Sequence, residues 1–253
     1  MKRKIQKYGW RPDLPDFRDL CYTPEVAAFA ALPASVDLRP QCPPVYDQGK
    51  LGSCTANAIS CAIEFDQMKQ QETVFNPSRL FIYYNERDIE GDIDQDNGAQ
   101  IRDGIKACAS LGACDEQIWP YDISKFADKP SDAAYSAAAA HTITKYLSIA
   151  QDPNHIKAAL AEGTPVVFGF TVYDSFEGED VARTGELNMP VSGEATVGGH
   201  AVIIVGYDDA TQRYTVRNSW SDQWGQKGYF TMPYEYVHNP SLASDFWAIY
   251  TTK

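Results

Sequence analysis

Residues 48–56 read QGKLGSCTA, and this stretch decides where the first helix starts and what chemistry it carries. Gly49 and Gly52 break the chain, and the apolar spacing of residues 53–71 then predicts a helix. Cys54 stands in the first turn of that helix, where unpaired backbone N–H groups and the helix dipole favour a thiolate over a thiol. Taken alone, such a cysteine is more often a small buried side chain. Its partners in the fold must therefore decide its role.

Three polar residues elsewhere in the sequence complete a set for nucleophilic catalysis. His200 follows two glycines and opens the apolar run HAVIIVGY, so we expect it at the start of a strand. Asn218 ends the run RYTVRN and can hold the imidazole in orientation. Gln48 precedes Cys54 by six residues, and its side-chain amide together with the Cys54 backbone N–H can face a developing oxyanion. The other histidines are expected to be structural.

The order of helical and extended segments predicts an α+β protein. Helices are expected from Ser53, from Pro77 with Asn76 as its cap, from about Ile101 to Gly112, and from Pro153 to Gly163. Beyond them, β-branched and aromatic runs predict strands at 165–173, 200–207, 213–217, 228–232 and 246–251. Residues 133–140 are expected to form surface helix or loop, and 174–199 a long polar loop. Helices first and strands later indicate two lobes with a cleft between them.

Composition excludes several classes of protein. With 253 residues, 44% of them hydrophobic and 22% charged, the chain has the composition of a globular protein large enough to bury a core. Its net charge of −12 would repel a phosphate backbone, so nucleic acid is not an expected partner. No apolar run approaches the roughly 18 residues of a membrane span. No C-x-x-C spacing occurs, so a structural zinc site is not expected.

Three sequence blocks, taken together, resemble the signatures of papain-like cysteine peptidases. They are QGKLGSCTA at 48–56, GGHAV at 198–202 and NSWSDQWGQKGYF at 218–230. The chain order Gln, Cys, His, Asn is also that of the family. LPASVDLR at 32–39 and GTPV at 163–166 resemble two further segments, so the resemblance extends over about residues 32–253. It implies a papain-like two-lobe fold, in which a helical lobe and a β-barrel-like lobe enclose the active-site cleft.

The resemblance assigns roles to four residues. Cys54 is the nucleophile, His200 is the general acid and base, Asn218 orients His200, and Gln48 donates to the oxyanion. Cys54 would then form a thioester while His200 protonates the leaving amine, and water would release the acyl group with His200 as base. All these groups belong to the protein. No cofactor and no metal ion is therefore implied.

The resemblance also implies a substrate-binding surface. Residues 97–99, NGA, resemble the segment that pairs with the substrate backbone, but Ala99 replaces the usual second glycine and its methyl group narrows the approach. Small residues in the main specificity pocket suggest room for a bulky apolar side chain. Two tryptophans could cover the Asn218–His200 hydrogen bond. The expected substrate-binding residues are Gly98, Ala99, Ile101, Gly169, Gly198, Gly199, Ala201, Trp220 and Trp224.

Two positions beside the nucleophile depart from the common pattern of the family. Leu51 stands where animal and plant relatives often have a cysteine, so their disulfide beside the nucleophile is missing, and Thr55 replaces the usual residue after Cys54. Both departures fit a bacterial branch rather than a lysosomal one. Cys61 is expected to be buried and inert. The remaining cysteines, which leave open whether up to two disulfides form, are Cys21, Cys42, Cys108 and Cys114.

The chain divides into an N-terminal extension, residues 1–31, and a catalytic domain, residues 32–253. Within the domain, the helical lobe is expected over about 50–140, and the β lobe over about 141–253 plus 32–49. The extension is too short for the folded pro-domain of family zymogens, yet its run YGWRPDLPDFRD suits a groove at low entropic cost. Two placements stay open. The extension covers the cleft and restrains activity, or it packs on the back of the domain for stability.

The sequence therefore predicts a cysteine endopeptidase, made as a zymogen, that acts on peptides or proteins. One alternative is a catalytically silent papain-like binding or inhibitory module, against which the retention of all four catalytic residue types argues. Another is a relative with different amide chemistry, such as a transpeptidase, deamidase or exopeptidase. We expect a monomer that does not insert into membranes. The first residues lack the apolar segment of a classical export signal, so we expect a cytoplasmic protein or one exported without such a signal.

Overall fold

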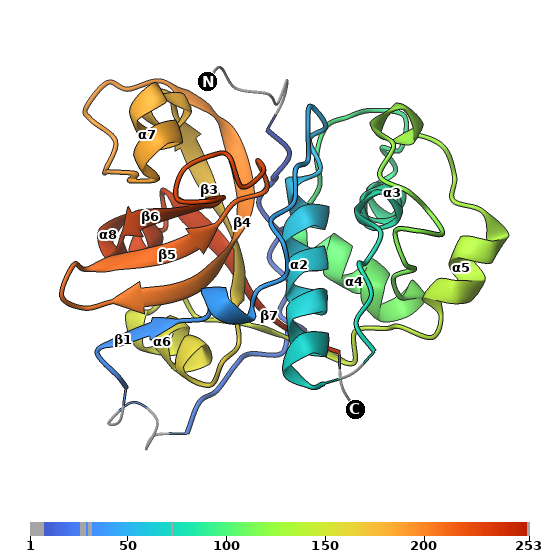
Figure 1. Cartoon of the computed structure of the whole chain (residues 1–253), viewed down its shortest axis with the longest axis horizontal. Helices are drawn as coiled ribbons and strands as arrows, with labels where there is room; N and C mark the ends of the chain where they lie inside the picture. Colours follow the sequence, from blue (N-terminus) through green and yellow to red (C-terminus); the bar gives the residue numbers. More distant parts are fainter. Residues whose placement is uncertain (1–7, 26–28, 30–31, 72, 252–253) are drawn as a thin grey trace.

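The structure is a computed structural model that describes residues 8–25, 29, 32–71 and 73–251. The chain forms two lobes, one helical and one built on an antiparallel sheet, with helix α2, Cys54–Lys69, between them (Figure 1). The predicted α+β class and its two lobes are confirmed. Residues 1–7, 26–28 and 30–31 of the predicted extension lie outside the described residues.

Helix α2 is the element on which both lobes pack. Every residue from Cys54 to Gln67 is buried, because α3 and α4 cover one side of the helix and the sheet covers the other. Small side chains such as Ala56 and Ala58 let the neighbouring elements approach closely. The helical lobe contains α3, Arg79–Glu90, α4, Ile101–Leu111, α5, Asp132–Ala138, and the 3-10 turn Ile123–Lys125.

The β lobe is one antiparallel sheet with the strand order β2-β7-β3-β4-β5-β6, and β1 pairs with β4. Its strands are β1 Ser35–Asp37, β2 Lys145–Ser148, β3 Val166–Tyr173, β4 Thr196–Asp208, β5 Arg213–Arg217, β6 Tyr229–Pro233 and β7 Ala243–Tyr250. Around the sheet lie α6 Pro153–Ala161, α7 Glu179–Thr184, α8 Tyr234–His238 and the 3-10 turns Arg39–Gln41 and Asp174–Glu177. Most of β3 and β4 is buried, which explains their continuous apolar runs.

The pairing of β3 with β4 positions the residues expected in the cleft. Phe170 lies opposite His200, and Gly169 lies opposite Ala201. Because side chains alternate along a strand, this register fixes which face of the sheet each of them reaches. The register therefore places Gly169, which has no side chain, diagonally next to His200 in the sheet.

Several predicted boundaries were wrong. The strand that carries His200 begins at Thr196, so His200 is not at its start, and the last strand begins at Ala243 rather than at Phe246. Helix α3 begins at Arg79 rather than at Pro77, because the Ser78 hydroxyl accepts a hydrogen bond from the Phe81 N–H at 3.1 Å and makes Ser78 the cap. Residues 174–199 are not one long loop, since they contain a 3-10 turn, α7 and the first residues of β4. The alanine-rich stretch forms α5. All six cysteines are free thiols, so none of the disulfides that the sequence left open is present.

The N-terminal strip, residues 8–25, belongs to the same hydrophobic core as the two lobes. Tyr8, Trp10 and Tyr22 are buried in the cluster that spans both lobes. The dark-blue segment in Figure 1 runs between the lobes and then along the lower edge of the molecule. It therefore follows both placements that the sequence left open, the first part in the cleft and the later part on the domain.

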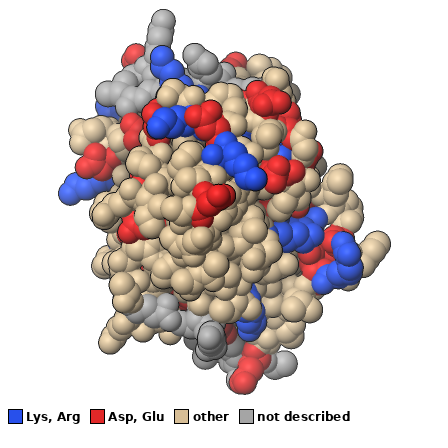
Figure 2. All heavy atoms as spheres, turned by 90° about the vertical axis from the view of Figure 1, so that its right-hand side faces the viewer, with Lys and Arg blue, Asp and Glu red and all other residues tan. Residues whose placement is uncertain are grey.

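The molecular surface gives two further observations. Figure 2 shows a face of the helical lobe on which acidic and basic side chains are interspersed in the upper half, above a broad area without charges. In the part of the chain that the structure describes, no helix has the length and apolarity needed to span a membrane.

Candidate active site

Cys54 is the first residue of α2, and its side chain is fully buried. The sulfur accepts a hydrogen bond from the Ala201 N–H at 3.4 Å, so β4 and α2 meet at this atom. Gly9 of the strip lies against Gly52, two residues before Cys54. The thiol is thus placed at the junction of the two lobes, with the strip across it.

His200 lies beside this junction and is held by Asn218. Its Nε2 is 2.8 Å from Asn218 Oδ1, and the same oxygen accepts the Ser219 N–H at 2.8 Å. Since that oxygen can only accept, the imidazole must carry its hydrogen on Nε2. The other ring nitrogen, Nδ1, has no hydrogen-bond partner among the described residues. It is therefore the nitrogen left for proton transfer.

Gln48 is held at both ends of its side-chain amide. Its Oε1 accepts the Ser219 hydroxyl at 2.6 Å, and its Nε2 donates to the Leu51 carbonyl at 2.9 Å. The Gln48 N–H also donates to the Ser219 carbonyl at 2.9 Å. One hydrogen of Nε2 remains unused by these bonds. This hydrogen and the Cys54 N–H, at the start of α2, are the two candidate oxyanion donors.

Aromatic rings enclose the imidazole. Trp220 stacks on His200 with ring centroids 5.2 Å apart and an interplanar angle of 30°. Phe176 and the strip residue Tyr8 also contact the ring, with centroids 6.2 and 5.7 Å away. Trp224 contacts Trp220 rather than His200, at 5.2 Å. Rings packed in this way keep water from competing for the His200–Asn218 hydrogen bond.

The strip pairs with both walls of the cleft through its main chain. The Ala99 N–H donates to the Gly9 carbonyl at 2.7 Å, and the Arg11 N–H donates to the Ala99 carbonyl at 3.0 Å. On the other wall, the Trp10 N–H donates to the Gly199 carbonyl at 2.9 Å. Ala99 thus pairs through its backbone with an extended segment that has a glycine at the closest point.

Gly9 occupies the tightest point of the cleft. A Cβ atom on Gly9 would lie 1.6 Å from the Gly52 carbonyl oxygen, and one on Gly98 would lie 1.9 Å from the Gly9 carbonyl oxygen. Gly98 also has a φ of +72°, which favours glycine. Two glycines are needed for the strip to pass this close to Cys54.

The Trp10 side chain fills a pocket of the β lobe. A Cβ atom on Gly169 would lie 1.9 Å from the indole, and one on Gly199 would lie 2.5 Å from it. The indole N–H donates to Asp245 Oδ2 at 2.9 Å. These positions therefore have room for the Trp10 indole, and a carboxylate stands in the wall, so the surroundings are not purely apolar.

Several predicted residues thus come together around the strip, and others stand apart. Gly98, Ala99, Gly169 and Gly199 contact residues 9–11, and Gly198 lies against Tyr8. Ala201 acts through its backbone N–H on Cys54. Ile101 begins α4 and is fully buried, but no described contact links it to the strip. Trp224 contacts Trp220, which separates it from His200.

Burial under the strip changes the acidity of the two reactive groups. It raises the pKa of Cys54 to about 12, although the Ala201 and Gly9 N–H groups act in the opposite direction. Burial also lowers the pKa of His200 to about 4, against the effect of the Asn218 hydrogen bond. Burial therefore disfavours the thiolate that the helix start was expected to favour.

Two residues at the cleft escaped the sequence analysis. Gly9 had no signal except its position between two aromatic residues. Asp245 lies in a strand-forming run, SDFWAI, where its polarity and its φ of +61° mark an irregular position. Within the described residues, no group of three His, Cys, Asp or Glu side chains could hold a metal ion.

Comparisons with known proteins place the chain among cysteine proteases. A family model described as "Papain family cysteine protease" matches residues 32–248. The crystal structure of xylellain, a cysteine protease from Xylella fastidiosa, is 47% identical, covers 100% of this chain and 99% of that chain, and has a TM-score of 0.93. An uncharacterized peptidase C1-like protein of Acanthamoeba polyphaga mimivirus is 44% identical, over 96% of this chain and 86% of its own length. A recombinant stem bromelain precursor, 19% identical over 94% of this chain and 76% of its own with a TM-score of 0.74, shares the fold.

Proposed function

The chain belongs to the papain family of cysteine proteases, and on this basis we propose that it is an endopeptidase acting through a Cys54 thioester. The observation that carries the proposal is the meeting of three groups at one junction. Cys54 starts α2, the His200–Asn218 pair lies on the strands beside it, and the Gln48 amide is fixed by Ser219. A nucleophile, an oriented base and an oxyanion donor are the parts that acyl transfer requires.

In the first half of the reaction, the Cys54 sulfur attacks the carbonyl carbon of the substrate. The new S–C bond forms and the C–N bond breaks, while the negative charge on the carbonyl oxygen is stabilised by the Cys54 N–H and by Gln48 Nε2. His200 Nδ1 takes the proton of the Cys54 thiol as the sulfur attacks, and then delivers this proton to the leaving amine. In the second half, water adds to the thioester, Nδ1 takes a proton from it, and Cys54 leaves as the thiolate.

The N-terminal strip is proposed to inhibit this reaction in the full-length chain. The Gly9 carbonyl accepts the Ala99 N–H at 2.7 Å, so it is bonded to the wall of the cleft and not to the two oxyanion donors. A peptide that is to be cut must present its carbonyl carbon to the sulfur and its oxygen to the oxyanion donors. The strip therefore blocks the cleft without being a substrate in this orientation.

Docking of the strip also suppresses the reactivity of Cys54 and His200. Because burial raises the pKa of the thiol and lowers that of the imidazole, both groups are neutral at neutral pH while the strip covers them. When the strip leaves, water reaches the cleft and the desolvation that caused both shifts is relieved. Removal of the strip should then restore the ion pair that the reaction uses.

A silent binding module and a different amide chemistry remain the alternatives to test. Peptides with both termini blocked discriminate them, because only an endopeptidase cuts such a peptide internally. The protein is further proposed to act as a monomer, since all four groups of the site come from one chain. Light scattering after size-exclusion chromatography, at the assay concentration, tests this.

The main experiment is labelling with an epoxide that traps reactive thiolates, read by intact mass and peptide mapping. We expect one adduct on Cys54, which forms slowly in the full-length chain and faster once the strip has been displaced. No adduct should form in Cys54→Ala. Cys61→Ala is the matched control, because Cys61 is a buried thiol two turns along the same helix. Absence of both the adduct and cleavage with the strip displaced would favour the silent module.

A further inference from the structure

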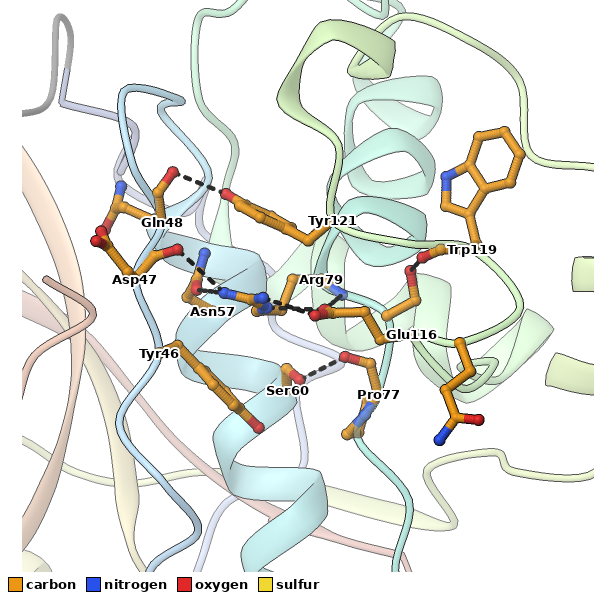
Figure 3. A network of polar contacts seen from close by, with 12 residues as sticks. Tyr46, Asp47, Gln48, Asn57, Ser60, Pro77, Arg79, Glu116, Trp119 and Tyr121 are labelled. Atoms are coloured by element: carbon orange, nitrogen blue, oxygen red, sulfur yellow. Dashed lines mark hydrogen bonds and ion pairs between the residues drawn. The ribbon is translucent and has the colours of Figure 1, made fainter. Parts of the chain in front are cut away.

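Arg79, the first residue of α3, lies in a buried network beside the site (Figure 3). Its Nε and Nη2 donate to the two oxygens of Glu116 at 2.8 and 2.7 Å, a bidentate pair. Its guanidinium also lies over the rings of Tyr121 and Tyr46, 4.0 and 4.8 Å from their centroids. Glu116 and the two rings therefore fix the guanidinium in position and orientation.

The remaining nitrogen of Arg79 reaches the segment that carries Gln48. Nη1 donates to the Asp47 carbonyl at 3.3 Å. The next carbonyl, that of Gln48, accepts the Tyr121 hydroxyl at 3.0 Å. Burial raises the pKa of Tyr121 to about 12, so this hydroxyl stays protonated and donates. Two consecutive carbonyls of the Gln48 segment are thus held by Arg79 and by the ring stacked on it.

The same nitrogen of Arg79 also reaches the start of α2. Nη1 donates to Asn57 Oδ1 at 3.3 Å, and Asn57 Nδ2 donates to the Ser53 carbonyl at 2.9 Å. The Ser53 hydroxyl lies 2.5 Å from the Tyr121 hydroxyl. Tyr121 therefore joins the residue before Cys54 to the carbonyl of Gln48. Arg79 stacks on this ring and bonds to Asp47, which precedes Gln48, and to Asn57, which bonds to Ser53.

We propose that Arg79, clamped by Glu116, is a positioning residue that sets the separation between the two oxyanion donors, the Gln48 side chain and the Cys54 N–H. The inference rests on the proposed function. Gln48 and Cys54 are six residues apart, with Gly49 and Gly52 between them, and all six cysteines are free, so no disulfide restrains the turn that sets the distance between the two donors. Stabilisation of an oxyanion depends on donors already placed before the charge develops. Arg79 supplies that placement without contacting the substrate.

The test separates stabilisation of the oxyanion from the reactivity of the Cys54 thiol in the full-length chain. A peptide aldehyde forms a tetrahedral adduct with Cys54 whose oxygen needs both donors, whereas alkylation by iodoacetamide needs the thiol but no oxyanion donor. Both reagents require an open cleft, so their comparison cancels the contribution of the strip. For Arg79→Met we expect the affinity for the aldehyde to fall about 10- to 100-fold, which is less than the roughly 10²- to 10³-fold effect of removing one donor completely. The rate of alkylation should change by less than about twofold.

Further variants keep the inference falsifiable. Arg79→Lys, which keeps the charge but not the forked geometry, and Glu116→Gln should give smaller losses in the same direction. Arg213→Met is the matched control, because Arg213 binds Thr231 and Leu187 on the far side of the sheet. In a Gln48→Ala background, Arg79→Met should cost much less than in the wild type, since one donor is already absent.

Three results would overturn the inference. Equal losses of aldehyde affinity and alkylation rate would mean that Arg79 only supports the fold, as would an equal aldehyde loss in the Arg213→Met control. An undiminished effect of Arg79→Met in the Gln48→Ala background would mean that it does not act through Gln48. A wild-type chain in which Cys54 reacts with neither reagent would instead contradict the proposed function.

Discussion

At the scale of single residues, Gly9 decides whether the strip can stay in the cleft. Any side chain there would meet the Gly52 carbonyl oxygen, 1.6 Å from the position of a Cβ atom. For Gly9→Ala we expect the full-length chain to hydrolyse peptides about tenfold faster or more, because overpacking of this kind typically costs about 1–3 kcal/mol of docking free energy. Initial rates with a blocked peptide measure this.

The control for Gly9→Ala is Leu14→Ala. Leu14 belongs to the same strip, but its side chain is 70% exposed, so its removal should leave the rate unchanged. A Gly9→Ala chain that is folded and no faster than the wild type would show that the strip does not limit activity.

Asp13 and Asp245 link the strip to the β lobe and make its docking sensitive to pH. The Asp13 N–H donates to Asp245 Oδ2 at 2.8 Å, and the Trp247 indole N–H donates to Asp13 Oδ2 at 2.9 Å. Burial, and then the charge of Asp245, raise the pKa of Asp13 to about 7, although Arg102 and Trp247 act in the opposite direction. The pKa of Asp245 is raised too, chiefly by burial.

The strip should therefore be held less tightly as the pH rises. A released strip has its Asp13 carboxyl at an ordinary pKa of about 4, so docking takes up a proton between about pH 4 and pH 7. In Asp245→Asn, the amide oxygen can still accept both hydrogen bonds while the repulsion is gone. Burial of Asp13, the larger cause, is still present in Asp245→Asn, so the ratio of Cys54 alkylation rates, wild type over Asp245→Asn, reports only the contribution of the Asp245 charge. It should rise as the pH approaches 7, by less than about tenfold per unit, and level off above about pH 7.

Using a ratio of rates cancels the ionisation of Cys54 and His200 themselves. Glu25→Gln is the control, because Glu25 is an exposed acid of the same strip. The ratio of alkylation rates, wild type over Glu25→Gln, should not change with pH. A wild-type to Asp245→Asn ratio that is constant from pH 5 to pH 8 would contradict this linkage.

Residue type and order were enough to predict Cys54, His200, Asn218 and Gln48 as candidates, because each stands in a short block that can be read locally. Asp245 and Arg79 could not be predicted. The partner of Asp245, Trp10, is 235 positions away in the sequence, and Arg79 reaches Asp47 across 32 positions. Nothing in the sequence around either residue indicates what it will meet, since packing alone brings the partners together.

At the scale of elements, helix starts were predictable where one cap residue had no competitor. Asp152 caps α6 as expected, and its Oδ1 accepts the Asn154 N–H at 2.9 Å. Before α3, however, Asn76, Pro77 and Ser78 all suit a helix start. Ser78 caps the helix because its N–H also bonds to the Cys114 carbonyl at 2.8 Å, a contact outside the local sequence.

Packing among α2, α3 and α4 depends on Gly104. A Cβ atom there would lie 2.4 Å from Glu86 Oε2 on α3 and 2.5 Å from Ile59 Cδ1 on α2. Glu86 is fully buried, so its side chain has little room to move away. Burial also raises the pKa of Glu86 to about 8. For Gly104→Ala we expect a loss of about 1–3 kcal/mol in the free energy of unfolding, measured by urea denaturation followed by tryptophan fluorescence.

Ser110→Ala provides the comparison for Gly104→Ala on the same helix. Ser110 is exposed at the end of α4, so its substitution should change the free energy of unfolding by less than about 0.5 kcal/mol. If the two variants unfold at the same urea concentration, close packing at Gly104 is not what holds the three helices together.

At the scale of the whole molecule, the strip has two parts with different neighbours. Residues 8–11 lie in the cleft. Further on, Arg102 of α4 forms an ion pair with Asp19 at 2.7 Å, and the Tyr22 N–H donates to the Ser148 carbonyl of β2 at 2.8 Å. The composition of the strip predicted an extended segment, but the two surfaces it follows exist only after the lobes have assembled. For that reason the sequence left both placements open.

This division predicts that inhibition and stability can be separated by truncation. Removing residues 1–12 should open the cleft and raise the rate of Cys54 labelling, while the ion pair to α4 and the pairing with β2 remain. Removing residues 1–31 should give a similar labelling rate but a lower free energy of unfolding, because those contacts and the buried Tyr22 are also lost. Labelling followed by mass spectrometry and urea denaturation measure the two properties on the same samples. If the shorter truncation labels no faster than the full-length chain, residues 8–11 do not block the cleft; if both truncated chains are equally stable, the later part of the strip contributes nothing to the fold.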